Sequence, residues 1–223
     1  MILGNCKIIT IQTGRLAQNC YVIRHIPSGN LLLIDPGADA HLILDAIKRE
    51  GSRLRHILLT HAHYDHVGAL KEISEKFELH FFLHEKDIKL LNRAPTYALA
   101  FEKKILKISR NYQFYKDYLS STVGRVHVIN LPGHTPGGVC LHLKGFAFTG
   151  DLLLNDSFGH ITDLPGFDAL ELDKSITKMF SLLPANTILF PGHGKPWTVD
   201  MAKNCWINQR KKLLTQSEKI LYE

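Results

Sequence analysis

The chain has 223 residues, of which 45% are hydrophobic and 22% charged, with a formal net charge of +6 when the histidines are neutral. This is the composition of an ordinary globular protein, long enough for one domain over residues 1–223 whose core needs no disulfides. No apolar run approaches the roughly 20 residues of a membrane span, and residues 1–12 lack the features of a secretory signal. The four cysteines lie far apart with no CxxC pair, so we expect a reducing, cytoplasmic location.

The first third of the chain alternates apolar strands with turns and helices. Strands are expected at residues 7–11, 20–26, 31–34, 56–60 and 79–83, and helices at residues 39–49 and 67–77. Hairpins that feed β-α-β units predict an α/β layered arrangement.

Residues 85–122 have a different pattern, and we expect a helical insertion here. Residues 85–91 favour a helix, Pro95 is expected to end it, and residues 98–119 are charged, helix-prone and rich in aromatic side chains. The insertion is either an ordinary pair of packing helices or a lid over the substrate.

Strand patterns return at residues 125–131, 139–143, 146–149 and 187–190. Two apolar stripes at helical spacing complete the chain. One runs from Leu172 to Leu183 and the other from Val199 to Ile220.

Four potential metal ligands lie within six residues, directly after the apolar run Ile57-Leu58-Leu59. They are His61, His63, Asp65 and His66. Alternate residues of an extended segment share one side, so His61 and His63 can point to one spot while the other two point to a second. Imidazole and carboxylate ligands together favour zinc or a similar divalent ion.

Three later segments share one form, an apolar strand followed by a turn that carries one histidine or aspartate. They present His134, Asp151 and His193. Nearby glycines and prolines allow a tight turn at each strand end. The seven ligands together are enough for two metal sites, and a carboxylate shared by two ions is a usual bridge in two-metal hydrolases.

The seven ligands, in this order, resemble the five-motif pattern of the metallo-β-lactamase superfamily. The resemblance covers nearly the whole chain and implies a four-layer αββα sandwich with metals at one sheet edge. By position it implies one metal on His61, His63 and His134, a second on Asp65, His66 and His193, and Asp151 as the bridge. Asp35, in Leu33-Ile34-Asp35-Pro36-Gly37, is similar to the early aspartate that supports the ligands from behind.

Within the superfamily the chain most resembles glyoxalase II (hydroxyacylglutathione hydrolase) and its short relatives. The supporting stretches are His84-Glu85-Lys86-Asp87, residues 132–138, Asp163-Leu164-Pro165-Gly166, Leu182-Leu183-Pro184 and residues 190–196. Glyoxalase II has a C-terminal helical domain that supplies much of its glutathione site, whereas only about thirty residues follow His193 here. Residues 159–163 also depart from the Gly-Arg-x-Asp of those enzymes. The resemblance therefore supports the same hydrolytic residues in this chain, but it gives little support for a glutathione pocket.

The expected function is hydrolysis of a thioester or ester by a dinuclear metal hydrolase. Two divalent ions, expected to be zinc with iron or manganese as alternatives, lower the pKa of bridging water to supply hydroxide near neutral pH. They also stabilise the oxyanion that forms after attack on a carbonyl. Asp65 and Asp151 are the expected catalytic residues, and the resemblance gives Asp65 the role of orienting the hydroxide and relaying its proton. A thiolate leaves with little acid help, which favours a thioester.

Other functions on this fold stay open. Phosphodiester cleavage is motivated by two basic groups, one formed by Lys103, Lys104, Lys107 and Arg110 and the other by Arg210, Lys211 and Lys212. Solvated helix faces are the favoured interpretation of these groups, so we expect a small-molecule substrate, which the charges allow to be anionic, rather than nucleic acid. Lactone opening and single-iron persulfide oxidation are further alternatives, although iron-binding relatives lose part of the second ligand set that is complete here.

A non-catalytic module stabilised by metal is the last alternative, but seven ligands exceed the needs of a closed structural zinc. Among the remaining histidines, His160 is expected in an exposed loop, with a place at the pocket rim as the alternative. The acyl group, the released thiol or alcohol and the oligomeric state are not predicted.

Overall fold

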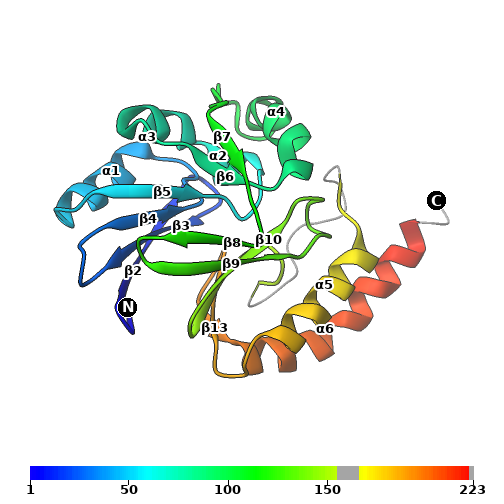
Figure 1. The fold of residues 1–223 in the computed structure, drawn as a ribbon. Helices are drawn as coiled ribbons and strands as arrows, with labels where there is room; N and C mark the ends of the chain where they lie inside the picture. The colour runs from blue at the N-terminus through cyan, green and yellow to red at the C-terminus, as the bar shows by residue number, and fades with distance from the viewer. Residues whose placement is uncertain (155–165, 221–223) are drawn as a thin grey trace.

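Two β-sheets pack face to face at the centre of the molecule, and helices cover their outer faces (Figure 1). The computed structural model describes residues 1–154 and 166–220, with side chains described as far as Arg210. None of the helices in these ranges is both long and apolar enough to cross a membrane.

Among the described residues, the first sheet has seven strands, in sequence order across the sheet. They are β1 (Ile2–Leu3), β2 (Cys6–Thr13), β3 (Gln18–His25), β4 (Leu31–Ile34), β5 (Leu54–Leu58), β6 (Phe81–Leu83) and β7 (Tyr112–Phe114). Strands β1 to β4 are antiparallel neighbours, whereas β4 to β7 run parallel. The segments between the parallel strands contain α1 (Ala40–Arg49), α2 (Tyr64–Val67), α3 (Leu70–Phe77), η1 (Glu85–Asp87), α4 (Ile88–Tyr97) and η2 (Ala98–Glu102).

The second sheet has the strand order β13-β12-β11-β10-β9-β8 in the described part of the chain. Its strands are β8 (Tyr118–Ser121), β9 (Gly124–Asn130), β10 (Val139–Leu143), β11 (Phe146–Gly150), β12 (Ile188–Pro191) and β13 (Trp197–Thr198). Among the described strands of this sheet, only β11 and β12 pair in parallel, and α5 (Ala169–Leu182) lies between them in the sequence. Helix α6 (Val199–Ile220) follows β13 directly.

Three apolar clusters hold four layers together. Tyr21, Phe148 and Phe190 lie at the centre of the cluster between the sheets. A second cluster joins the first sheet to α1, α3 and α4, and a third joins the second sheet to α5 and α6. Helices on both outer sides of two stacked sheets confirm the predicted αββα sandwich.

The prediction of a helical insertion is correct only in its first half. Pro95 lies inside α4 instead of ending it, and the chain continues into the single π-turn η2. Residues 98–119 were expected to be helical beyond this point, but they include β7 and the start of β8. Tertiary contacts explain the difference: Tyr112 packs on Phe81 across the sheet, and the Tyr115 hydroxyl donates to the Leu59 carbonyl at 2.9 Å.

Strand direction determines where the polar turns meet. Strands β4 and β5 are parallel, so Asp35 and the segment at residues 59–66 follow strand ends at one edge of the first sheet. In the second sheet, β9, β11 and β12 all run in one direction, because β9 and β11 are both antiparallel to β10. Two backbone bonds join the sheets at this edge, from Val139 N–H to Thr60 O at 2.9 Å and from Asn19 N–H to Gly192 O at 2.7 Å.

Candidate metal centre

The segment after β5 presents its ligands in two local conformations. His61 and His63 precede α2, and His63, immediately before it, has an extended backbone, whereas Asp65 and His66 lie within that short helix. A close approach to the preceding loop holds the junction between α2 and α3, because Ala69 N–H donates to both Pro36 O and Gly37 O at 3.0 Å. A Cβ at Gly37 would collide with the Asp65 carbonyl, so this approach requires glycine.

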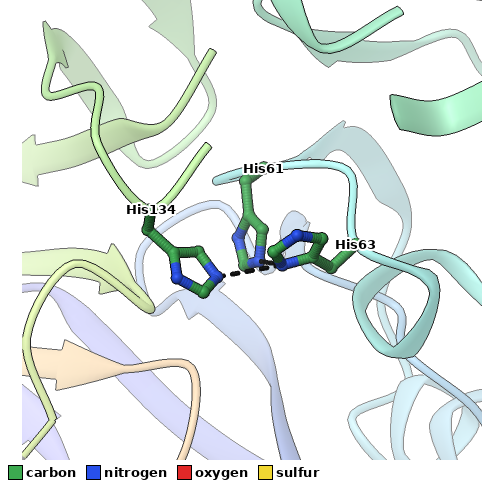
Figure 2. A group of neighbouring side chains, drawn as sticks. All are labelled: His61, His63 and His134. Carbon is green, nitrogen blue, oxygen red and sulfur yellow. Dashed lines mark hydrogen bonds between the residues drawn. The ribbon is translucent and has the colours of Figure 1, made fainter. Parts of the chain in front are cut away.

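Three histidines converge on one point, as Figure 2 shows. His63 Nδ1 lies 3.1 Å from His61 Nε2 and 2.9 Å from His134 Nε2, and all three side chains are buried. One atom from each residue lies within 4.8 Å of the others. Ligand atoms around a tetrahedral zinc ion are separated by roughly 3.3 to 3.6 Å, so this group has suitable spacing for a metal ion.

Asp65, His66 and His193 form a second group beside the first. His193 Nε2 lies 3.1 Å from Asp65 Oδ2, and His66 Nε2 lies 3.7 Å from the same oxygen. The structure therefore also brings these three predicted ligands together, although they come from α2 and from the turn after β12.

Asp151 lies between the two groups. Its Oδ1 is 3.5 Å from His66 Nε2, and its Oδ2 is 3.6 Å from His134 Nε2 and 3.5 Å from His193 Nε2. Gly192 is required beside it, because a Cβ there would collide with the Asp151 carboxylate. The predicted bridging residue thus faces histidines of both groups.

Two buried atoms test whether these residues fit a metal. Among the described residues, none offers a hydrogen-bond partner to His66 Nε2 or to Asp151 Oδ1. Leaving buried polar atoms without a partner is costly, and both atoms point into a set of imidazole and carboxylate donors. A divalent first-row cation would satisfy both, so the donor set fits a metal ion.

The protonation of the first group favours metal binding. Burial, with His134 nearby, lowers the pKa of His63 to about 3. Burial also lowers the pKa of His61 and of His134, so all three imidazoles stay neutral near neutral pH, as metal ligands must be.

Carboxylates reverse this effect in the second group. Burial opposes protonation of His66, but Asp151 and Asp65 outweigh it and raise the pKa well above its usual value. Burial likewise disfavours charge on Asp151, yet His66 and His193 hold its pKa well below its usual range. The carboxylates therefore favour a positive charge beside them, carried by a protonated imidazole or by a metal cation in place of the proton.

Asp35 supports both groups from behind, in the position that the resemblance implied. Its carboxylate accepts from Thr60 N–H at 2.7 Å and from the Thr60 hydroxyl at 2.6 Å, and it lies 3.0 Å from His66 Nδ1. Thr60 Oγ1 is in turn 3.1 Å from His61 Nδ1. A proton on each Nδ1 would leave Nε2 of both histidines free for a metal.

Asp87 is a supporting residue to which sequence reasoning gave no role. It is fully buried and accepts from Ala62 N–H at 3.1 Å, the Thr135 hydroxyl at 2.9 Å and Gly137 N–H at 2.6 Å. It thereby ties the turn that carries His134 to the segment that carries His61. Its place in the sequence could have indicated this role. Asp87 follows β6, which is parallel to β5, so it lies at the same sheet edge as the ligand segment.

Asn19 has a similar role at the other group and was not predicted either. Its side-chain amide donates to Pro191 O at 3.0 Å and to Gly194 O at 2.9 Å, so it holds the turn that carries His193. Its place at the start of β3 gave no sequence signal for this contact. His160 and the neighbouring departure at residues 159–163 lie outside the described residues.

Comparison with known proteins agrees with this geometry. Residues 13–193 match the model of the metallo-beta-lactamase superfamily. The chain belongs to this superfamily. Among its relatives, hydroxyacylglutathione hydrolase GloC of Haemophilus influenzae is 32% identical over 214 residues, which cover 92% of this chain and 99% of GloC. The probable metallo-hydrolase YqgX of Bacillus subtilis is 33% identical, over 81% of this chain and 87% of that protein.

Solved structures of superfamily members show the same fold. TTHA1623 in a di-iron-bound form has a TM-score of 0.80 and 33% identity, covering 88% of this chain and 98% of that one. The B3 metallo-beta-lactamase BLEG-1 also has a TM-score of 0.80, with 29% identity over 93% of this chain and 99% of that one. The chain is thus a member of a superfamily that includes metallo-hydrolases, and it has a histidine and aspartate cluster compatible with a metal site.

Proposed function

We propose that this protein is a dinuclear metal-dependent hydrolase that cleaves thioesters, of the hydroxyacylglutathione hydrolase kind. The observation that carries the proposal is the position of Asp151, whose two oxygens face histidines of both ligand groups. A carboxylate in this position suits a bridge between two ions.

The GloC relative supports the thioester class. The resemblance to glyoxalase II gave little support for a glutathione site, because that enzyme's C-terminal helical domain supplies much of it. GloC, however, aligns over 99% of its own length with 92% of this chain, so a relative of that name has the same extent. The C-terminal domain is therefore not an argument against a thioester substrate. Esters with a good leaving group belong to the same proposal.

Zinc is the proposed metal, with iron or manganese as alternatives. Five imidazoles and two carboxylates suit zinc and also suit iron, and the di-iron form of TTHA1623 shows that a relative binds iron. Two divalent ions in these groups would lower the pKa of a bound water and polarise the substrate carbonyl.

The chain's own acid–base group in this proposal is Asp65. Its Oδ2 lies 3.1 Å from His193 Nε2, and its side chain is 13% exposed, so it is the acid of the second group that a substrate can approach. We assign its carboxylate the transfer of a proton from the attacking water to the leaving thiolate. His61, His63 and His134 stay neutral through burial and act as ligands without taking part in proton transfer.

The proposed partner is a small-molecule substrate, which can carry negative charge. Ion pairs weaken the case for nucleic acid, because Arg210 forms two bonds to Asp173 at 2.6 and 2.7 Å and Lys104 lies 3.1 Å from Glu102. The proposed location is the cytoplasm, in keeping with the buried thiols of Cys6, Cys20 and Cys140, which form no disulfide.

The test combines metal analysis with a substrate panel. Protein loaded with zinc, iron or manganese is assayed on a hydroxyacylglutathione thioester, simple thioesters, an ester, a lactone and a phosphodiester. We expect two metal ions per chain and the highest kcat/KM on a thioester. His61→Ala should lose metal and activity together, whereas His41→Ala, on the exposed face of α1, should keep both. A His61→Ala protein that retains both metal and thioesterase activity would contradict the proposal.

One second candidate is favoured by a particular comparison. The similarity to BLEG-1 makes β-lactam hydrolysis a reaction to include in the panel. Both reactions involve attack of water on a carbonyl, so the same ligand groups can serve either. A β-lactam kcat/KM above that of every thioester would replace the thioester assignment.

A further inference from the structure

A cleft of about 180 Å³ opens beside the second ligand group. Four segments form its walls. They are residues 13–16 at the turn between β2 and β3, residues 37–39 after β4, residues 64–68 in and just after α2, and residues 98–106 after α4. We call it the side cleft. The proposed function leaves it without a role.

The side cleft is continuous with the candidate metal centre. Asp65 belongs both to its lining and to the second ligand group. Leu16, at the tip of the β2–β3 turn, also lines the cleft, and its carbonyl lies 3.0 Å from His193 Nδ1. A substrate bound at the centre can therefore extend one of its ends into the cleft.

The lining of the side cleft is largely apolar. Ala98, Leu106 and the Tyr64 ring form part of its walls, and Leu16 and Ile105 stand at its rim. Leu16 is 49% exposed and Ile105 is 87% exposed. Large aliphatic side chains grouped around a cleft next to a reactive centre are typical of a surface that a ligand covers.

The charges in the side cleft disfavour an anionic occupant. Asp39, Asp65 and Glu102 line it together with two cations, Arg15 and Lys104. Lys104 pairs with Glu102 at 3.1 Å, and the Asp39 carboxylate accepts from Gly14 N–H at 2.8 Å. A glutathione-like leaving group, which carries net negative charge, would find no excess of positive charge here.

The wall at residues 98–106 is held in place by its own contacts. Lys103 has a positive φ of 57°, and its N–H donates to Leu99 O at 3.1 Å while Lys104 N–H donates to Ala98 O at 3.3 Å. The Phe101 ring stacks on Tyr64 with a centroid distance of 6.1 Å. The side cleft is thus formed before a ligand binds, which reduces the entropic cost of binding.

We propose that the side cleft binds an apolar acyl group of the substrate, and that Leu16 and Ile105 set the preference for acyl length. This inference rests on the proposed hydrolase function, since the acyl carbonyl must lie at the metal centre. The leaving group then lies outside the side cleft. The substrate class becomes thioesters with an aliphatic or aromatic acyl group, beyond the short hydroxyacyl group of the GloC reaction.

A binding experiment tests this inference without depending on turnover. Metal-loaded protein is titrated calorimetrically with straight-chain carboxylates from acetate to octanoate, which are the acid products of such substrates. We expect the Kd to fall on the order of threefold for each methylene that enters the cleft. The double variant Leu16→Ser/Ile105→Ser should bind acetate like the wild type and lose most of the dependence on chain length. Leu99→Ser is the matched control, because Leu99 is 55% exposed in the same segment but does not line the cleft.

Two thioester series then separate the two halves of the substrate. With one thiol and a lengthening acyl group, the wild-type kcat/KM should rise, and the double variant should flatten the rise. With one acyl group and varied thiols, the double variant and the wild type should show the same preferences. A Kd independent of chain length, or a double variant that alters only the thiol series, overturns the inference. Chain-length-dependent binding without any thioester turnover would instead overturn the proposed function alone.

Discussion

Asp35 Oδ2 lies 3.0 Å from His66 Nδ1 and also accepts the Thr60 hydroxyl at 2.6 Å. Thr60 Oγ1 is 3.1 Å from His61 Nδ1, so one buried carboxylate orients a ligand in each of the two groups. The link to His66 is direct, whereas the link to His61 passes through one hydroxyl. Substitutions at Asp35 and Thr60 should therefore have different effects on the two groups.

Thr60→Val removes the hydroxyl while leaving the contact between Asp35 and His66. We expect metal affinity at the first group to fall by roughly 10- to 100-fold, because His61 loses the partner that sets its ring orientation. Affinity at the second group should change little. Competition with a chelator, followed by metal analysis, measures the two affinities.

Asp35→Asn should weaken both groups, because it removes the acceptor for His66 and one acceptor for Thr60. Equal losses at both groups in Thr60→Val would contradict the indirect link. The exposed α1 substitution Asp45→Asn is the control and should leave both affinities unchanged.

Asp65→Asn should remove the metal from the second group first. Asp65 is the carboxylate of that group nearest to His193, and an amide is a poorer ligand for a divalent ion. We expect the metal content to fall from two ions per chain to one, held by His61, His63 and His134. Metal analysis after dialysis measures the stoichiometry, and retention of two ions would exclude this assignment of ligands.

The clustering of the candidate ligands was predictable because each follows an apolar strand. The run Ile57-Leu58-Leu59 and the turn glycine Gly150 mark strand ends in the sequence, and parallel strand ends share one sheet edge. Supporting residues were harder to find. Asn19 reaches the His193 turn across 175 residues of sequence to Gly194, and no local pattern encodes such a contact.

The error at residues 98–119 has a similar cause. This segment has the charge and length of a helix, and its strand positions are decided by contacts elsewhere, such as Tyr112 on Phe81. Pro95 was misread because a proline within a helix removes only one backbone donor, and the π-turn that follows accommodates the chain. Sequence patterns predict helices and strands well where buried residues recur periodically. They predict poorly where a contact between distant aromatic side chains determines the secondary structure.

Asp87→Asn should destabilise the protein without touching a ligand. The Asp87 carboxylate accepts three hydrogen bonds, with Gly137 N–H on one oxygen and Ala62 N–H on the other. An amide keeps only one oxygen, so one of these two N–H groups loses its acceptor. An unsatisfied buried donor costs about 1 to 3 kcal/mol of the free energy of unfolding. Urea unfolding of metal-loaded protein measures the loss. Glu85→Gln, exposed on the same turn, should cost almost nothing, and an equal loss in both variants would argue against this role.

Removing the metals should lower the melting temperature, because the ligand groups are poorly satisfied without them. His66 Nε2 and Asp151 Oδ1 are buried and find no hydrogen-bond partner among the described residues. A metal at 100 times its Kd stabilises the folded state by about 2.7 kcal/mol. For a chain of this size, this corresponds to a shift on the order of 5 to 10 °C for each ion. Thermal unfolding before and after chelation measures the shift.

Zinc should restore the original melting temperature, whereas magnesium should not, since it prefers oxygen ligands and this centre offers mainly imidazole nitrogen. Equal recovery with both ions would contradict a centre built from these histidines.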